Sequence, residues 1–169
     1  DAISKDIAEK FSGNPVELIY FDGEMNNKEE YYTATGSILG NIKTNNVYIW
    51  GVGFISKDSI MKCKPKEIFS VRGSETRNML KNMGFSCPEV YGDPVLLFPK
   101  FYNPKIEKKY KLGIIPHYIN NKNKMLDKFR KIPEIKVINI LNTNKYEFID
   151  DVLSCEKIIS SSLRFLILQ

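Results

Sequence analysis

The sequence has little of several residues that mark specialised proteins. Its 169 residues include only three cysteines, Cys63, Cys87 and Cys155, and a single histidine. Three widely spaced cysteines form neither a disulfide framework nor a zinc pattern, so a reducing, cytoplasmic setting is the simplest interpretation. No stretch approaches the roughly 20 apolar residues that a membrane-spanning helix needs. Disorder is excluded as well, because 43% of the residues are hydrophobic and can form a core.

Lysine carries most of the positive charge. The chain has 25 Lys and Arg against 20 Asp and Glu, which gives a net charge of +5 and favours anionic partners. The basic residues are spread along the chain without an arginine-rich arm, which argues against nucleic acid. In this lysine-rich background an arginine is expected where a forked, bidentate contact is needed. The arginines are Arg72, Arg77, Arg130 and Arg164.

Short apolar runs alternate with amphipathic segments. The pattern predicts helices at residues 1–12, 74–83, 122–131, 146–154 and 163–169, the second of them capped by Ser74. It predicts strands at residues 16–21, 35–39, 47–51, 68–71, 110–116, 135–141 and 157–162, with residues 88–94 returning to the sheet edge. This alternation is typical of an α/β fold with parallel strands.

Pro99 and Pro104 mark a linker between two halves. We therefore expect an N-terminal α/β domain at 1–99, a linker at 100–109 and a partial C-terminal α/β domain at 110–169. The sequence begins with a helix that lacks its preceding strand and stops inside an apolar helix. These ends predict either a fragment of a larger two-domain protein or a naturally shortened relative.

Three segments that follow expected strands carry groups able to bind anions or move protons, two of them at strand-to-helix turns and the third at His117. In open α/β sheets, ligands collect beyond the carboxyl ends of the strands. The turn at residues 71–77 offers Arg72, Arg77 and Ser74 for phosphate or carboxylate, although a capping role for Arg72 and a surface ion pair for Arg77 are the structural alternatives. The turn at residues 160–164 adds Ser162 and Arg164.

The single histidine, His117, follows the strand expected at 110–116. An imidazole there could transfer a proton near neutral pH, and a merely hydrogen-bonded histidine is the alternative. Asp93 lies in a tight Gly-Asp-Pro turn and is a second candidate for proton transfer, although it could instead bind local amides. The pair Gly51 and Gly53 lacks the third glycine and the spaced acidic residue of a dinucleotide fingerprint, so no nucleotide cofactor is indicated.

These segments, in this order, resemble the polysaccharide pyruvyl transferase family. The resemblance covers most of the chain. It rests on Asp-Ala-Ile-Ser at 1–4, Trp-Gly-Val-Gly-Phe at 50–54, Val-Arg-Gly-Ser-Glu-Thr-Arg at 71–77, Tyr-Gly-Asp-Pro at 91–94, Gly-Ile-Ile-Pro-His-Tyr at 113–118, Phe-Ile-Asp-Asp at 148–151 and Ser-Ser-Ser-Leu at 160–163.

The resemblance implies two Rossmann-like halves of the glycosyltransferase B type, the second truncated here, with the active site in the cleft between domains. It implies transfer of an enolpyruvyl unit from phosphoenolpyruvate to a sugar or lipid-linked oligosaccharide, which forms a pyruvate ketal on a cell-surface or exopolysaccharide precursor. Such an acceptor suggests peripheral association with the inner face of the cell membrane. This reaction requires neither a metal nor an organic cofactor.

On the family pattern, Arg72 matches an arginine associated with donor binding. Arg164 stands where the family has a histidine, and Phe165 stands where it usually has a glycine. A guanidinium keeps its proton at any physiological pH and is a poor proton donor, so we expect Arg164 to bind anions and His117 to transfer protons. Two alternatives stay open: a nucleotide-sugar glycosyltransferase of the same fold, and a truncated, non-catalytic sugar-binding relative.

Overall fold

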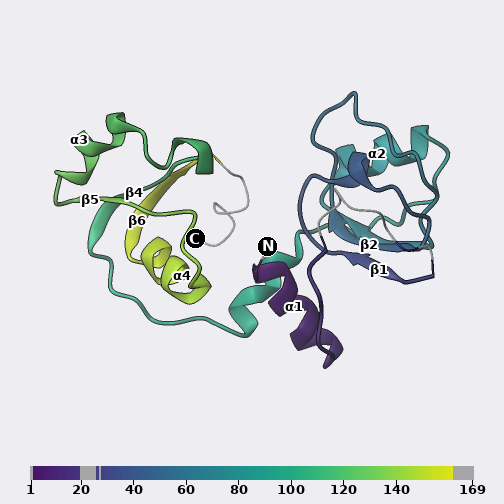
Figure 1. The fold of residues 1–169 in the computed structure, drawn as a ribbon, viewed down its shortest axis with the longest axis horizontal. Helices are drawn as coiled ribbons and strands as arrows, with labels where there is room; N and C mark the ends of the chain where they lie inside the picture. Colours follow the sequence, from purple (N-terminus) through teal and green to yellow (C-terminus); the bar gives the residue numbers. More distant parts are fainter. Residues whose placement is uncertain (1, 20–25, 27, 162–169) are drawn as a thin grey trace. The chain divides into compact units, whose positions relative to one another are not determined.

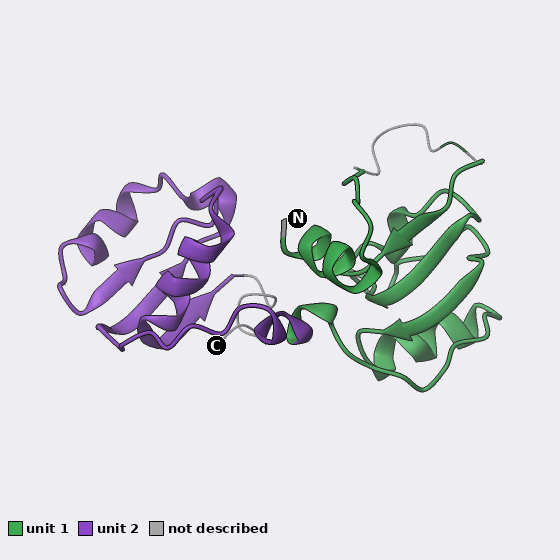
Figure 2. Cartoon of the chain, turned by 90° about the horizontal axis from the view of Figure 1, so that it is seen from below, with its two compact units in different colours: residues 1–96 green, residues 97–169 purple. Residues whose placement is uncertain are grey.

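The computed structural model of the chain describes residues 2–19, 26 and 28–161. It has a mixed α/β architecture with two small parallel sheets. The chain divides into two compact units, residues 1–96 and residues 97–169, which Figure 2 distinguishes by colour. The domains expected at 1–99 and 110–169, with a linker at 100–109, remain a prediction.

The first unit is built on a three-stranded sheet of order β1-β2-β3, in which both pairs are parallel. Tyr91 adds a parallel bridge to Val71 beside β3, so the expected return of residues 88–94 to the sheet edge is confirmed. The elements in chain order are α1 (Ala2–Ser12), β1 (Tyr31–Thr33), the 3-10 helix η1 (Leu39–Asn41), β2 (Val47–Val52), β3 (Glu67–Val71), α2 (Ser74–Asn82) and the 3-10 helix η2 (Pro94–Lys100), which continues into the second unit.

The two faces of this sheet have different coverings. Val47 and Ile49 of β2 are fully buried in a core that also takes Leu80 from α2. Side chains alternate along a strand, and Trp50 accordingly meets α1, where Phe11 packs edge-on at 6.0 Å between ring centroids. Figure 1 shows α2 above the strands of this unit and α1 below them.

The second unit has a three-stranded parallel sheet of order β5-β4-β6. A strand order that reverses in this way, with right-handed connections, sends successive helices to opposite faces of the sheet. Figure 1 shows this arrangement, with α3 on one side of the sheet and α4 on the other. The elements are β4 (Tyr110–Ile115), the 3-10 helices η3 (Tyr118–Asn120) and η4 (Lys124–Leu126), α3 (Asp127–Arg130), β5 (Ile135–Val137), α4 (Lys145–Leu153) and β6 (Cys155–Ser160).

The strand expected at 35–39 is wrong, and the described part of the strand expected at 16–21 forms no strand. Residues 16–19 form no regular structure, because the amide of Val16 donates to the Glu9 side chain of α1 (3.1 Å) rather than to a strand. Tyr20 and Phe21 lie outside the described residues. The segment 35–39 forms a turn, since Gly36 adopts a φ of 106°, and the strand lies earlier, at Tyr31–Thr33.

Two further elements are shorter than expected. The helix at 122–131 reduces to η4 and α3, because Asn123 caps a start at residue 124. The strand at 135–141 ends at Val137, where the Asn139 side chain accepts the amide of Leu141 at 3.0 Å and bends the chain. The helix expected at 163–169 lies outside the described residues.

Gly113 on the central strand β4 makes room for β6. A Cβ at this position would lie 2.5 Å from Ile158 Cδ1 and 2.8 Å from Cys155 Sγ. We expect Gly113→Ala to destabilise the second unit by about 1–3 kcal/mol through overpacking. Scanning calorimetry should show a lower Tm for the transition of this unit.

The double variant Gly113→Ala/Ile158→Val, which removes the clashing Cδ1, should recover part of that loss. Gly40→Ala is the matched control, because its Cβ would meet Ser59 at an ordinary 3.5 Å. Equal Tm values for Gly113→Ala and Gly40→Ala would contradict the packing argument.

Candidate functional site

The carboxyl ends of the three parallel strands of the first unit bring three polar segments to one edge. Ser37 follows β1 within a turn, Gly53 follows β2, and Arg72 follows β3. Backbone hydrogen bonds join these segments, from the amide of Gly53 to the carbonyl of Gly36 (3.0 Å) and from the amide of Arg72 to the carbonyl of Val52 (3.0 Å). This edge is where open α/β sheets bind their ligands.

The Arg72 side chain is held at this edge by two polar groups. Its Nη1 donates to Ser37 Oγ at 2.8 Å, and its Nε lies 3.5 Å from Asp93 Oδ2 in an ion pair. Nε is buried and has no hydrogen-bond partner among the described residues. The side chain is still 24% exposed. Arg72 is therefore oriented by the protein while part of it faces solvent.

Asp93 is the buried member of this pair, with a side chain only 3% exposed. Its Oδ1 accepts the amide of Val95 at 3.1 Å, and its Oδ2 faces Arg72. A buried carboxylate is stable only when it is paired and hydrogen-bonded. Both oxygens are thus engaged by protein groups, which suits Asp93 to holding Arg72 better than to moving a proton.

Gly51 and Gly53 allow the chain to pack tightly around Arg72. Gly51 has a φ of 75°, and a Cβ there would lie 2.3 Å from Pro94 Cδ and 2.6 Å from the carbonyl oxygen of Gly92. A Cβ on Gly53 would lie 3.1 Å from Thr76 Oγ1 and 3.5 Å from Arg72 Cβ. The two glycines therefore serve the packing of the Gly-Asp-Pro turn and of Arg72 against β2.

Ser74 and Arg77 lie on the helix that follows Arg72. The cap of α2 is Gly73, without a side-chain hydrogen bond, so the expected cap at Ser74 is wrong by one residue; Ser74 is the first helical residue and is exposed. Arg77 Nε donates to the carbonyl of Cys87 at 3.2 Å, and its Nη2 lies 3.8 Å from Glu89. These contacts join α2 to the segment that follows it.

His117 lies at the corresponding edge of the second unit, two residues beyond β4. Its Nδ1 accepts the amide of Ile119 at 3.4 Å, and its ring packs against Tyr118 with 4.3 Å between centroids. An Nδ1 that accepts a hydrogen bond leaves Nε2 as the protonated nitrogen of the neutral ring. The imidazole is partly exposed, so Nε2 can reach a ligand.

Two more strand ends lie beside His117 in this unit. Asn139 follows β5, and its Oδ1 accepts from Asn121 Nδ2 at 2.7 Å. Ser160 ends β6 in register with Ile115 of β4, and the amide of Ser161 donates to the Ile115 carbonyl at 3.4 Å. Ser162 and Arg164 lie outside the described residues. The described part of this edge is thus polar, and the phenol ring of Tyr118 lies against the imidazole.

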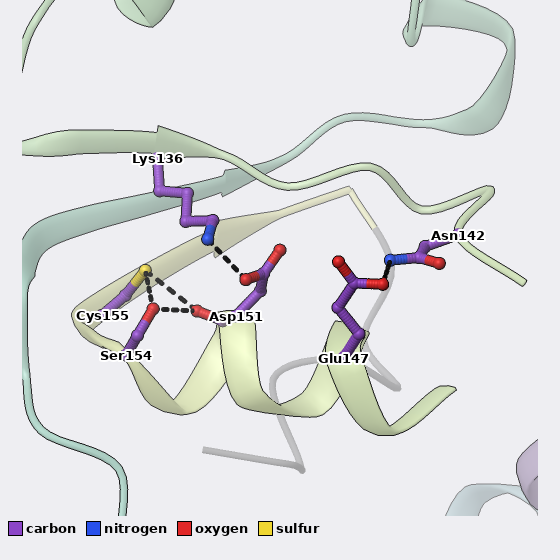
Figure 3. A network of polar contacts seen from close by, with 6 residues as sticks. All are labelled: Lys136, Asn142, Glu147, Asp151, Ser154 and Cys155. Atoms are coloured by element: carbon purple, nitrogen blue, oxygen red, sulfur yellow. Dashed lines mark hydrogen bonds and ion pairs between the residues drawn. The ribbon is translucent and has the colours of Figure 1, made fainter. Parts of the chain in front are cut away.

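A separate polar network, shown in Figure 3, joins α4 to the sheet. Lys136 of β5 pairs with Asp151 of α4, whose backbone carbonyl accepts from Ser154 Oγ at 2.7 Å and Cys155 Sγ at 3.4 Å. Asn142 donates to Glu147 at 3.2 Å. Lys136 and Asp151 point toward each other, as do Asn142 and Glu147 a little further along α4, and Cys155 is fully buried. The pair of Lys136 and Asp151 links the helix to the sheet.

A shallow hollow of about 410 Å³ lies on the second unit, beside β5. It is lined by Tyr110, Arg130, Ile132, Pro133, Ile135, Lys136 and Val137. Its two cations already have protein partners, since Lys136 pairs with Asp151 and Arg130 pairs with Asp127 at 2.7 Å. We therefore assign no anionic ligand to this hollow.

Comparison with known proteins decides the family. The family model described as polysaccharide pyruvyl transferase matches residues 4–163, nearly the whole chain. The chain belongs to the polysaccharide pyruvyl transferase family. This confirms the resemblance and makes the protein an enzyme of the transferase class. No curated protein and no solved structure gives a significant match.

Within residues 2–19, 26 and 28–161, no group of three or more His, Cys, Asp or Glu side chains is placed to hold a metal ion. No helix in the same part of the chain has the length and apolar character needed to cross a membrane.

Ser37, at the strand ends of the first unit beside Arg72, is a site residue that the sequence does not single out. The segment Thr-Gly-Ser at 35–37 is expected to be a strand, whereas Gly36 turns the chain there and Ser37 reaches Arg72. The polar link between Ser4 of α1 and Thr35 anchors the same turn. The signal available in the sequence was a glycine beside two hydroxyl residues, which is typical of turns.

The three thiols of the transferase are buried, and burial raises the pKa of Cys63, Cys87 and Cys155 above its ordinary value. A raised pKa leaves less thiolate at a given pH. We expect the native thiols to react with a disulfide reagent at pH 7.5 at least about tenfold more slowly than an exposed thiol.

Ile55→Cys provides the exposed thiol for comparison, because Ile55 is 81% exposed. The four thiols of that variant should separate into one fast and three slow, and all should react rapidly in denaturant. A fast native thiol in the unmodified chain would contradict the burial of the cysteines.

Proposed function

We propose that this member of the polysaccharide pyruvyl transferase family transfers an enolpyruvyl unit from phosphoenolpyruvate to a sugar of a cell-surface or exopolysaccharide precursor. The observation that carries this proposal is the Arg72 guanidinium at the end of β3, held by Asp93 and Ser37 and partly open to solvent. The donor carries a phosphate and a carboxylate, and a guanidinium recognises both groups in bidentate fashion.

The reaction is balanced without a metal or an organic cofactor. One sugar hydroxyl adds to the central carbon of the donor while the methylene carbon takes up a proton. A second hydroxyl of the same sugar then displaces phosphate from that carbon, and a base accepts its proton. Positively charged groups that hold the departing phosphate lower the barrier of the second step.

We assign donor binding to Arg72, with the exposed Ser74 as a further contact from the start of α2. Asp93 positions the guanidinium, and Arg77 supplies positive charge to the same helix while it contacts Cys87 and Glu89. Ser162 and Arg164 are proposed as further donor contacts from the sequence pattern alone. A lysine could not replace Arg72 at equal strength, because an ammonium is a point charge.

We assign proton transfer to His117. Its Nδ1 is fixed by the amide of Ile119, which leaves Nε2 for a reacting group. We also propose that the two units correspond to the two Rossmann-like halves of a glycosyltransferase B fold, the second shorter than usual, and that the enzyme works in the cytoplasm on a sugar or lipid-linked oligosaccharide. The parallel sheets of both units support this assignment.

Arg72→Lys should weaken donor binding by about tenfold or more, because a charged hydrogen-bonded fork is replaced by a single ammonium. Isothermal titration with phosphoenolpyruvate measures the effect, and a phosphate-release assay should show a matching rise in the donor KM. Arg130→Lys is the matched control, since Arg130 lies on an exposed helix and pairs with Asp127.

Titration with a uridine-diphosphate sugar separates the proposed pyruvyl transfer from its two alternatives, a nucleotide-sugar glycosyltransferase and a non-catalytic relative. Binding of the nucleotide sugar in place of phosphoenolpyruvate would overturn the donor assignment in favour of a glycosyltransferase. Binding of neither would favour a non-catalytic relative.

His117→Gln should lower kcat by about 10²-fold or more while the donor Kd stays within about twofold, because glutamine keeps a hydrogen-bonding group but cannot transfer protons. Single-turnover phosphate release with an acceptor sugar measures kcat, and titration measures Kd. Asn139→Gln at the same edge is the control for a change in polar surroundings. An unchanged kcat in His117→Gln would remove His117 from the proton-transfer role.

A further inference from the structure

The second unit presents large apolar side chains to solvent within one short part of the chain. Tyr118 is 57% exposed, Ile119 72% and Met125 68%, and Leu141 beyond β5 is 56% exposed. The contacts described above hold these segments together, because Asn139 Oδ1 accepts from both Asn121 and the amide of Leu141. We call residues 118–131 together with Leu141 the basic-apolar surface.

The same surface is strongly positive. Residues 118–131 contain five cations, Lys122, Lys124, Lys128, Arg130 and Lys131, against one carboxylate, Asp127. Arg130 pairs with that carboxylate and also donates to the carbonyl of Asn121 at 3.1 Å. Within the described residues the four lysines have no carboxylate partner, and Lys128 lies 5.0 Å from the Phe129 ring. Their charge is thus available to an external anion.

We propose that the basic-apolar surface docks this protein on an anionic bilayer. Exposed aliphatic and aromatic side chains that alternate with lysines match a membrane surface, which has an apolar acyl region beneath a layer of charged headgroups. The apolar groups enter the acyl boundary, while the ammonium groups stay at the level of the lipid phosphates. Each lysine near an anionic surface strengthens binding roughly fivefold. Neither the apolar side chains nor the lysines alone would give stable attachment to a membrane.

Charge complementarity favours this occupant over others. Two copies of the surface would bring like charges together, which disfavours a symmetric contact between copies of the chain. A nucleic acid would use the lysines but would leave Ile119 and Met125 exposed to water, and no aromatic array is present here for base stacking. A bilayer with anionic headgroups uses both kinds of side chain.

The inference does not depend on the donor chemistry. The benefit of docking rests on the proposed function, because docking would bring the enzyme to an acceptor whose lipid lies in the bilayer. Vesicle binding is measured without substrate. If the protein did not bind vesicles, the expected effect of Arg72→Lys on donor binding would still stand. If Arg72→Lys had no effect on donor binding, the expected vesicle binding would still stand.

The test is flotation of the full chain with vesicles of phosphatidylcholine alone and of phosphatidylcholine mixed with phosphatidylglycerol. We expect binding to the mixed vesicles only, weakening as salt is raised. Lys122→Gln/Lys124→Gln should weaken binding roughly fivefold for each lysine removed. Ile119→Ser/Met125→Ser should weaken it about tenfold or more, because the buried apolar area is lost.

Matched controls come from the first unit, where Ile55 and Ile60 are 81% and 61% exposed beside the exposed Lys57 and Lys62. Ile55→Ser/Ile60→Ser likewise removes two exposed apolar side chains, Lys57→Gln/Lys62→Gln likewise removes two charges, and both variants should leave vesicle binding unaltered. Circular dichroism should be unchanged for all four variants, since every substituted side chain is exposed.

Three outcomes would overturn the proposal. One is no binding to the mixed vesicles, and another is equal loss of binding in the test and control variants. The third is a dimer in analytical ultracentrifugation that Ile119→Ser/Met125→Ser dissociates, which would assign the surface to a second copy of the chain.

Discussion

The ion pair between Arg72 and Asp93 is the interaction on which the candidate donor site depends. A carboxylate that is 3% exposed requires a partner, because an isolated buried charge costs several kcal/mol. Arg72 meets that requirement and is fixed in return, since Asp93 is itself held by the amide of Val95. One buried group thereby determines the direction of a long, flexible side chain at the end of β3. Ser37 completes the restraint from the neighbouring strand end.

The restraint also sets what the site can do. A guanidinium committed to a full bidentate pair with Asp93 would have little left for a ligand. The observed geometry is looser, with one nitrogen 3.5 Å from the carboxylate and another bound to a neutral hydroxyl. Arg72 therefore keeps positive charge toward solvent while its position is defined. This arrangement suits recognition of a small, multiply charged anion.

Much of this organisation could be read from the sequence, where local chemistry decides the outcome. The helices at α1, α2 and α4 and the strands β2, β3, β4 and β6 follow from amphipathic or apolar runs with clear end signals. The short strand β1 could not be predicted, because three residues are too few to show periodicity and its pairing with β2 is a tertiary effect. Asn139 ended β5 early through a single side-chain hydrogen bond.

Arg72 and Asp93 could be selected as candidates from the sequence, but their contacts could not be predicted. Arg72 stood out by residue type and by its place after a strand. Its partners come from positions 35 and 21 residues away along the chain, and no local pattern connects them. Asp93 was foreseen as a turn residue that binds local amides, and its Oδ1 does so. That its other oxygen faces Arg72 depends on how the turn packs on β2, which only the fold determines.

The close approach of Pro94 to Gly51 has an evolutionary consequence. Because no side chain fits at residue 51, that position cannot change alone: a relative with any other residue at 51 must also change the Gly-Asp-Pro turn at 92–94. That turn carries Asp93, so the substitution would alter how the arginine is held. Across the family, the two positions should therefore vary together, and their joint loss should mark lineages in which this arginine has acquired a different anchor.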